Sequence, residues 1–275
     1  MSMLSTADPW NTVAEGYAAV TRNLFRTYSE IALELVPLKA GDVVADIACG
    51  PGTLTELAIA QAAKVTAVDF SDKMIAALEA SLPEFQRSKV RTIVGDGLAL
   101  DLPNDRFDAA FSMFGVIFFP DRARGFSELS RILRPGGTAC VSSWAPVNAS
   151  PLLSAMFGTL KLLNPELDDP KYDVESLENP EILKTEMQNA GFENVRVHSV
   201  QGWSEFASAK QFWQDMVAGS APLAVMRSQT PDAAWQQLSE RAIAHLAKTA
   251  GPFPKRFSAK AYLGIGHKPI KASDD

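Results

Sequence analysis

The chain has 275 residues, of which 47% are hydrophobic and 21% charged, and these proportions predict a globular protein with one large domain, with or without an inserted cap. The net charge of −6 and the lack of any basic run argue against a nucleic-acid partner, because phosphates are usually met by a basic face. No apolar stretch is long enough to span a bilayer and the polar N-terminus lacks a signal-peptide layout, so we expect no membrane partner.

The cysteines and histidines show no metal-ligand spacing. Cys49 and Cys140 form no CxxC pair, and His198, His245 and His267 are too scattered to suggest a cluster. We therefore expect neither a metal site nor a disulfide framework, and a reducing cytoplasm as the location.

The first half of the chain alternates between strand and helix patterns. Residues 10–36 carry apolar side chains every three to four positions, which predicts a helix. Apolar, β-branched runs predict strands, with helical patterns between them. The expected strands are 42–48, 64–69, 90–94, 107–112 and 138–144, and the expected helices are 53–62, one capped by Ser71 or Asp72, and 121–133. This alternation predicts a parallel, doubly wound sheet with right-handed crossovers.

The second half follows a different pattern. Residues 146–190 are helix-like and interrupted by prolines, which predicts a cap over the carboxyl ends of the strands. A sixth strand is expected at 192–200 and a last strand at 257–266, with helices at 208–218 and 231–249 between them.

Residues 43–55 carry the most informative motif. An apolar strand runs into Gly50-Pro51-Gly52 and then into a helix start, an arrangement that places backbone N–H groups beside a ligand. We expect Gly50 and Gly52 to be required because a Cβ would hinder close approach of the loop to that ligand. A dinucleotide fingerprint would need a small third residue where Thr55 stands, and no Gly-Lys-Ser/Thr of a P-loop follows.

The run Asp46-x-Ala48-x-Gly50-x-Gly52 resembles the first motif of class I S-adenosylmethionine-dependent methyltransferases. Ala48 departs from the glycine most often found at its position, but it is small enough to keep the turn close. The resemblance implies an α/β fold with a doubly wound, Rossmann-like seven-stranded sheet, mostly parallel with an antiparallel last strand, and a helical cap. It also implies S-adenosyl-L-methionine as the cofactor.

Acidic residues at the ends of the next two strands fit this resemblance. Asp69 ends the second strand, where a carboxylate can accept hydrogen bonds from both hydroxyls of a ribose, and Phe70 can lie against the adenine. In the family, an acid after the third strand accepts from the adenine amine and the next N–H meets a ring nitrogen, positions matched by Asp96 and Gly97. A solvated acid and a simple Asp-Gly turn are the alternative interpretations of Asp69 and Asp96.

The end of the fourth strand completes the implied cofactor site. Backbone carbonyls at Ser112 and Met113 are placed to hold the ammonium of the methionine moiety. The cofactor-binding residues that we predict are Asp46, Ala48, Gly50, Gly52, Asp69, Phe70, Met74, Asp96, Gly97, Ser112 and Met113.

The acceptor is expected to be a small molecule. The chain lacks the Asn/Asp-Pro-Pro-aromatic tetrapeptide of enzymes that methylate nucleic-acid bases, and residues 114–121 resemble the branch that includes quinone-ring and natural-product methyltransferases. The predicted function is O- or C-methylation of an aromatic, quinone-like or natural-product substrate by in-line displacement. An NAD(P)-dependent oxidoreductase and a non-catalytic S-adenosylmethionine-binding protein remain as alternatives.

No residue is identified from the sequence as a general base, and Tyr17 is a candidate only if the N-terminal helix folds over the cofactor. Aromatic side chains suit both planar substrates and a sulfonium cation, although aromatics at helical spacing are more often core residues. The substrate-binding candidates are Trp10, Tyr17, Phe118, Trp144 and Trp203, with Phe212 and Trp213 as further aromatic wall residues.

These expectations divide the chain into four parts. Residues 1–40 form a helical N-terminal segment or lid, and residues 41–145 form the S-adenosylmethionine-binding core. Residues 146–190 and 202–250 form helical cap elements, and residues 191–201 and 256–268 form the last strands of the core sheet.

Overall fold

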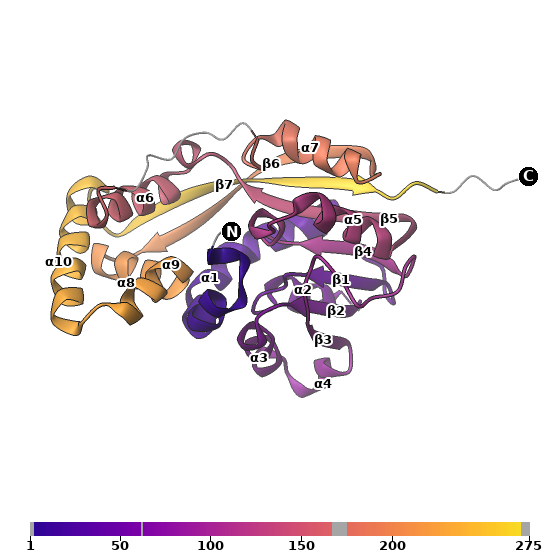
Figure 1. The fold of residues 1–275 in the computed structure, drawn as a ribbon, viewed down its shortest axis with the longest axis horizontal. Helices are drawn as coiled ribbons and strands as arrows, with labels where there is room; N and C mark the ends of the chain where they lie inside the picture. Colours follow the sequence, from indigo (N-terminus) through magenta and orange to yellow (C-terminus); the bar gives the residue numbers. More distant parts are fainter. Residues whose placement is uncertain (1–2, 62, 167–174, 271–275) are drawn as a thin grey trace, which may run out of the picture.

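The computed structural model describes residues 3–61, 63–166 and 175–270, so parts of the predicted segments 1–40, 53–62 and 146–190 lie outside the described residues. A seven-stranded sheet with helices on both faces adjoins an outlying helical region, and two long strands connect the two (Figure 1).

The strand order in the sheet is β3-β2-β1-β4-β5-β7-β6. Strand β7 runs antiparallel to both β5 and β6, and the other pairs are parallel, which confirms the predicted seven-stranded sheet with an antiparallel last strand. The strands are β1 Val43–Ile47, β2 Lys64–Asp69, β3 Val90–Val94, β4 Phe107–Ser112, β5 Leu133–Trp144, β6 Glu193–Phe206 and β7 Lys255–His267. The chain reverses its direction of winding between β1 and β4, and ligands of open α/β sheets bind at the carboxyl ends of the strands beside such a point.

Helices α1, α2 and α3 pack on one face of the sheet, and α5 and α7 pack on the other. The helices are α1 Ala7–Leu35, α2 Thr53–Ala60, α3 Asp72–Ser81, α4 Glu84–Arg87, α5 Arg122–Ile132, α6 Pro151–Leu163, α7 Pro180–Asn189, α8 Ala209–Gly219, α9 Ala221–Gln229 and α10 Asp232–Thr249. Short 3₁₀ turns lie at η1 Met3–Ser5, η2 Val116–Phe118 and η3 Val147–Ala149. None of the helices in the described ranges is both long and apolar enough to cross a bilayer.

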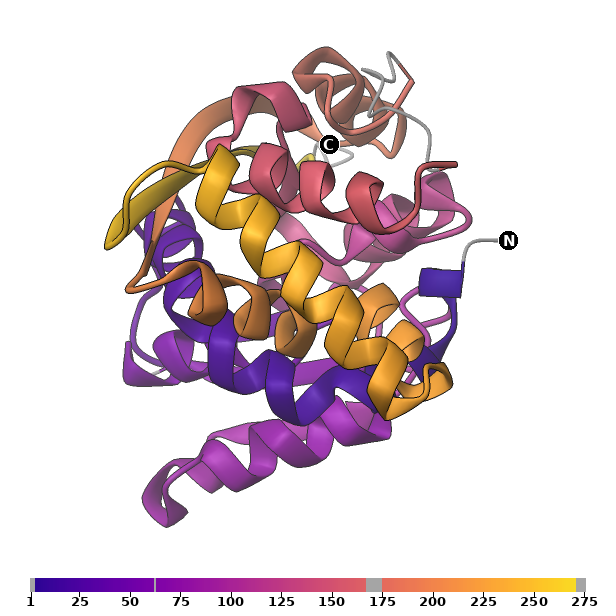
Figure 2. The same cartoon turned by 90° about the vertical axis from the view of Figure 1, so that its left-hand side faces the viewer.

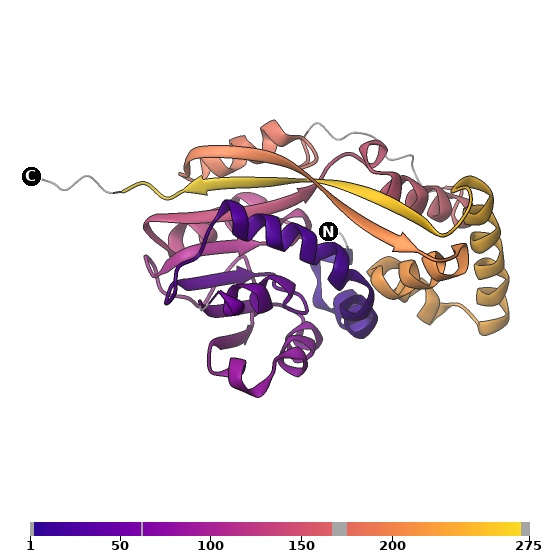
Figure 3. The ribbon, with the colours of Figure 1, turned by 180° about the vertical axis from the view of Figure 1, so that it is seen from behind.

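The last two strands extend further than their sequence patterns predict. Strand β6 continues past the expected 192–200 to Phe206, so residues 202–206, expected in a helical cap, belong to a strand instead. Pairing with β7 satisfies this backbone through the register Phe206↔Lys255. The outer parts of β6 and β7 form a two-stranded β6–β7 ribbon that extends beyond the sheet, and α6, α8, α9 and α10 lie around this extension (Figure 3). Figure 2 shows α10 lying across this outlying region, where it packs on α6 and α8.

The predicted cap at 146–190 is divided between the two regions. Helix α6 packs in the outlying region against α10, whereas α7 packs on the sheet. Leu183 and Met187 of α7 are buried directly over Gly264 of β7, where a Cβ would come within 3.0 Å of both side chains. Helix α7 is therefore part of the core, since its apolar stripe covers the sheet.

Residues 134–137, which separate the predicted helix 121–133 from the predicted strand 138–144, lie inside β5. The pairing of β4 with β5 jumps from Phe107↔Leu133 to Ala109↔Thr138, so the extra residues form an irregularity in the strand. Gly136 takes up the bend at φ +77°.

Candidate functional site

A cavity of about 540 Å³ lies at the carboxyl ends of β1, β2, β3 and β4. The loops after these strands form its floor, and η1 together with the N-terminal part of α1 covers it. Two hydrogen bonds tie this cover down, one from Ser71 Oγ to Asn11 Oδ1 (2.5 Å) and one from Ser5 Oγ to the Phe118 carbonyl (3.0 Å). The residues predicted for the cofactor that line it are Asp46, Ala48, Gly50, Asp69, Phe70, Met74, Asp96, Gly97 and Met113.

Two predicted residues do not line this cavity. Gly52 has φ +84° and starts α2, and a Cβ there would lie 2.1 Å from Leu78 Cδ1 of α3. Helix packing and the left-handed backbone therefore require this glycine, in place of the expected approach to a ligand. Ser112 is fully buried at the end of β4, and its Oγ has no hydrogen-bond partner among the described residues.

The loop from Ala48 to Gly50 is held in a left-handed conformation. Ala48 and Gly50 both have φ +54°, and the position of a Cβ on Gly50 is open, with no atom within 4 Å. The Ala48 methyl group fits because the neighbouring loop has Gly115, where a Cβ would lie only 2.4 Å from it. The unusual alanine and this glycine are thus sterically coupled.

Asp69 is 5% exposed and anchors the glycine loop to β2. Its Oδ2 accepts from the Gly50 N–H at 2.8 Å and its Oδ1 from the Ser71 N–H at 2.9 Å. Burial raises the pKa of this carboxyl to about 6, although the backbone hydrogen bonds oppose the shift. A carboxylate offers about four acceptor positions, so the two backbone bonds leave capacity for a ligand's hydroxyls.

Asp46 lies deeper, at 1% exposure, under the same loop. Its Oδ2 accepts from Thr55 Oγ1 at 2.6 Å, while Oδ1 is buried with no partner among the described residues. Burial raises the pKa of Asp46 to about 7, and the charge of Asp69 adds to the shift. Thr55, which breaks the dinucleotide pattern, therefore supplies the hydroxyl that this acid needs. An unmatched oxygen in the cavity wall suits a ligand that carries a donor or a positive charge.

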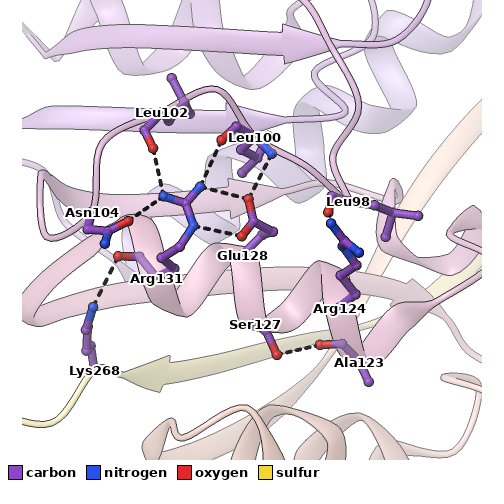
Figure 4. Close-up of polar contacts among 10 residues, drawn as sticks. All are labelled: Leu98, Leu100, Leu102, Asn104, Ala123, Arg124, Ser127, Glu128, Arg131 and Lys268. Carbon is purple, nitrogen blue, oxygen red and sulfur yellow. Dashed lines mark hydrogen bonds and ion pairs between the residues drawn. The ribbon is translucent and has the colours of Figure 1, made fainter.

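The loop after β3 is fixed from behind by α5 (Figure 4). Asp96 and Gly97 open this loop at the cavity, and Arg131 holds its continuation. The Arg131 guanidinium donates to the carbonyls of Leu100 (2.9 Å) and Leu102 (2.7 Å) and pairs with Glu128 at 2.7 Å. Further bonds in the same network run from Arg131 to Asn104 Oδ1, from the Leu100 N–H to Glu128, from Arg124 to the Leu98 carbonyl and from Lys268 to the Arg131 carbonyl.

A second cavity of about 720 Å³ adjoins the first, between α1, α6, α8, α9 and the outer part of the β6–β7 ribbon. Of the predicted acceptor residues, Trp10, Tyr17 and Phe118 line both cavities, and Trp144 and Trp203 line the second only. Phe212 also lines the second cavity, whereas Trp213 lines neither and stacks on Trp235 at 5.7 Å. The residues that line both cavities are Leu4, Trp10, Tyr17, Phe25, Phe114 and Phe118, which we call the shared wall.

The shared wall is largely aromatic. Phe114 stacks on Trp144 at 4.2 Å between ring centroids, and Tyr17 stacks on Phe25 at 5.7 Å. Burial raises the pKa of Tyr17, with a further contribution from the charge of Asp69, so its hydroxyl stays protonated. Phe25 and Phe114 were not among the predicted site residues, although Phe114 lies in the aromatic stretch after β4.

The lining of the first cavity fits an adenosyl sulfonium better than a dinucleotide. Three carboxyl groups line it, from Asp46, Asp69 and Asp96, and among the described residues no lysine or arginine does. A pyrophosphate would meet no neutralising cation there, whereas a cationic ligand with ribose hydroxyls matches acidic acceptors. No group of three or more metal-ligating side chains is found in the part of the chain that the structure describes.

Comparison with known proteins agrees with this site. Residues 44–137 match a methyltransferase domain. The demethylmenaquinone methyltransferase of Thermus thermophilus is 32% identical over 181 residues, which cover 58% of this chain and 79% of that protein. The ubiquinone/menaquinone biosynthesis C-methyltransferase UbiE of Ectopseudomonas mendocina is 26% identical over 71% of this chain and 84% of its own length.

Solved structures share the fold at low identity. Phosphoethanolamine N-methyltransferase 2 of Haemonchus contortus, solved with S-adenosyl-L-methionine, aligns with a TM-score of 0.59 and 18% identity over 94% of this chain and 57% of its own. The [4+2]-cyclase SpnF aligns with a TM-score of 0.53 and 19% identity over 89% of this chain and 82% of its own. These likenesses support the Rossmann-like methyltransferase fold, and neither the oxidoreductase nor the non-catalytic alternative finds support among the relatives. The chain belongs to the class I S-adenosylmethionine-dependent methyltransferases and acts on a small molecule.

Proposed function

We propose that this enzyme methylates a ring carbon or ring hydroxyl of an aromatic, quinone-like acceptor bound in the second cavity. The observation that carries the proposal is that the two cavities adjoin: the cavity with the three acids shares its largely aromatic wall with a larger cavity, which is lined by both apolar and polar side chains. A cavity of about 720 Å³ suits an acceptor of many heavy atoms, because ligand sites of this kind span roughly 300–1,000 Å³.

The proposed cofactor contacts follow from the acceptors that the first cavity offers. Asp69 keeps free lone pairs for the ribose hydroxyls, and Asp96 with the Gly97 N–H suits the adenine edge. The unmatched Asp46 Oδ1 suits the positively charged methionine end. When bound there, S-adenosylmethionine supplies an electrophilic methyl group on a good neutral leaving group.

The chain's own contribution is alignment and exclusion of water. A well-oriented pair of reactants reaches effective molarities of about 10⁵–10⁸ M, so positioning alone supplies much of the acceleration. Tyr17 lies in the shared wall, but its raised pKa disfavours the predicted role as a general base. We propose instead that the Tyr17 hydroxyl acts as a hydrogen-bond donor at the junction of the two cavities.

The acceptor class rests on the aromatic lining and on the relatives. Trp144 and Phe114 offer stacked faces to a planar ring, and the relatives named above are quinone-pathway methyltransferases. We further propose that residues 41–145 form the cofactor-binding core and that residues 1–40 act as its lid. A cytoplasmic location, with no nucleic-acid or membrane partner, completes the proposal.

The test is a transfer assay with methyl-labelled S-adenosylmethionine and a panel of acceptors. The panel contains 1,4-dihydroxynaphthalene kept reduced, catechol, dimethylglycine, phosphoethanolamine and a short oligonucleotide. We expect a product one methyl group heavier from a hydroxylated ring, together with S-adenosylhomocysteine. Transfer to an amine or to the oligonucleotide, with none to the hydroxylated rings, would refute the proposed acceptor class.

A further inference from the structure

Asp215 of α8 is an acid that lies in the wall of the second cavity, where we propose that the acceptor binds. Its side chain lines the second cavity and is half-buried. Among the described residues it has neither a hydrogen-bond nor an ion-pair partner. Its helix neighbours Phe212 and Met216 line the same cavity and are buried. The partial burial of Asp215 itself raises the pKa of its carboxyl. A half-buried carboxylate without a donor loses part of its hydration and gains no partner in return, so a bound ligand that supplies a donor is favoured.

The other charged side chains that line this cavity, Glu205 and Arg256, do not pair with Asp215. Glu205 and Arg256 are exposed and face each other across the β6–β7 ribbon at the outer part of the cavity. The Arg256 guanidinium lies 5.0 Å over the Trp203 ring, which is itself 46% exposed. Glu205 and Arg256 thus carry opposite charges next to each other at the outer part of the cavity, and Asp215 is the acid that lies further inside.

Helix packing directs Asp215 toward the side of the cavity formed by α1. Gly219, one turn further along α8, lies on the same helix face and packs on α1, where a Cβ would come within 2.9 Å of Val20 and 3.2 Å of Thr21. Thr21 is one turn from Tyr17 and donates to its carbonyl at 2.6 Å. The carboxylate and the shared wall thus belong to one continuous lining.

We propose that Asp215 anchors the acceptor by accepting a hydrogen bond from a ring hydroxyl remote from the methylated position. The anchor deepens the proposed function and rests on it for the identity of the ring. A neutral hydroxyl fits better than an ammonium group, because taking a cation out of water carries the larger desolvation cost and Arg256 already places a positive charge in the lining. Asp215 then selects hydroxylated rings over their ethers and orients the bound ring toward the shared wall.

The test measures binding of two matched probes to the protein saturated with S-adenosylhomocysteine. The probes are 1,4-dihydroxynaphthalene, kept reduced, and 1,4-dimethoxynaphthalene, which lacks the donors. The wild type is expected to prefer the diol by about 10- to 100-fold, the range for a hydrogen bond to a charged group. Asp215→Leu abolishes this preference and Asp215→Asn reduces it. Gln214→Leu, which changes an exposed neighbour on α8 that lines neither cavity, keeps the preference.

Three measurements decide the outcome: S-adenosylhomocysteine affinity, turnover of the diol and binding of the probes. The affinity for S-adenosylhomocysteine is expected to stay unchanged in every variant, which shows that the fold is intact. Turnover of the diol by the Asp215 variants is expected to show a raised KM with a smaller change in kcat. An unchanged diol preference in Asp215→Leu overturns the anchor, as does tighter Asp215-dependent binding of 1-naphthylmethylammonium than of the diol. If Asp215-dependent diol binding is found without methyl transfer, the anchor stands and the proposed acceptor chemistry fails.

Discussion

Asp69 carries the carboxylate that we propose as the hydrogen-bond acceptor for the ribose hydroxyls. Replacing it with asparagine removes the negative charge while changing the side-chain volume very little. In the protein, this carboxylate accepts the Gly50 N–H at 2.8 Å and the Ser71 N–H at 2.9 Å. The side-chain amide introduced by Asp69→Asn would turn one acceptor into a donor facing one of these N–H groups. The substitution therefore weakens the glycine loop as well as its remaining contacts to a ligand.

The magnitude follows from the number of hydrogen bonds lost. A hydrogen bond to a charged group contributes about 1.5–3 kcal/mol, and two ribose hydroxyls are at stake. Allowing for the oxygen that asparagine retains, we expect a loss of about 3–4 kcal/mol, which corresponds to roughly 10²- to 10³-fold in Kd. The assay is calorimetric titration of S-adenosylhomocysteine at pH 8, well above the Asp69 pKa of about 6, so that the wild-type carboxyl is ionised.

Asp72→Asn is the matched control, because Asp72 is exposed at the start of α3 and does not line the cavity. The control is expected to bind S-adenosylhomocysteine like the wild type. Thermal unfolding without ligand verifies that Asp69→Asn is folded. An Asp69→Asn protein that is folded and binds within about threefold of the wild type would refute the ribose assignment.

Three further predictions concern the site and its support. The unfolding free energy of the ligand-free protein should fall as pH rises from about 4 to about 7, because Asp46 and Asp69 in the folded protein hold protons that the unfolded chain has released. The stabilisation from these two protonated groups is fully present below pH 3.8 and is lost as pH rises through their folded pKa values. In urea titrations, the unfolding free energy of Asp46→Asn should depend less on pH than that of the wild type. Ala48→Gly should raise the unfolding free energy by about 0.5–1 kcal/mol, because glycine adopts the φ of +54° without strain. Gly115→Ala should destabilise the Ala48→Gly protein less than it destabilises the wild type, and equal effects in the two backgrounds would contradict the steric coupling of Ala48 and Gly115. Arg131→Leu should lower the unfolding free energy by about 2–3 kcal/mol, because the carbonyls of Leu100 and Leu102 and the Glu128 carboxylate lose their donor. An unchanged Tm would contradict the stabilising role of the Arg131 hydrogen bonds drawn in Figure 4.

The order of elements and the acids of the first cavity could be predicted because their signals are local. Apolar, β-branched runs mark the strands of the first half, Asp69 is the last residue of β2, and Asp96 lies two residues after the end of β3. The parallel sheet then brings those ends together. A short motif and strand order were enough to predict which loops meet.

Other features depend on contacts between distant residues, which periodicity does not record. Residues 202–206 alternate little in hydrophobicity and become a strand because β7 pairs with them. Thr55 only breaks a pattern in the sequence, and its hydrogen bond to Asp46 appears once the helix start is folded over β1. Asp215 resembles any acid on an amphipathic helix until α1, α6 and α8 close a cavity around it.

A crystal structure with S-adenosylhomocysteine bound would show whether the first cavity holds the cofactor and whether its sulfur atom faces the second cavity. We predict ribose hydroxyls within hydrogen-bond distance of Asp69, adenine beside Gly97, and the thioether sulfur at the shared wall, facing the second cavity. A sulfur atom that faces away from the shared wall, or a ribose that makes no contact with Asp69, would contradict this prediction.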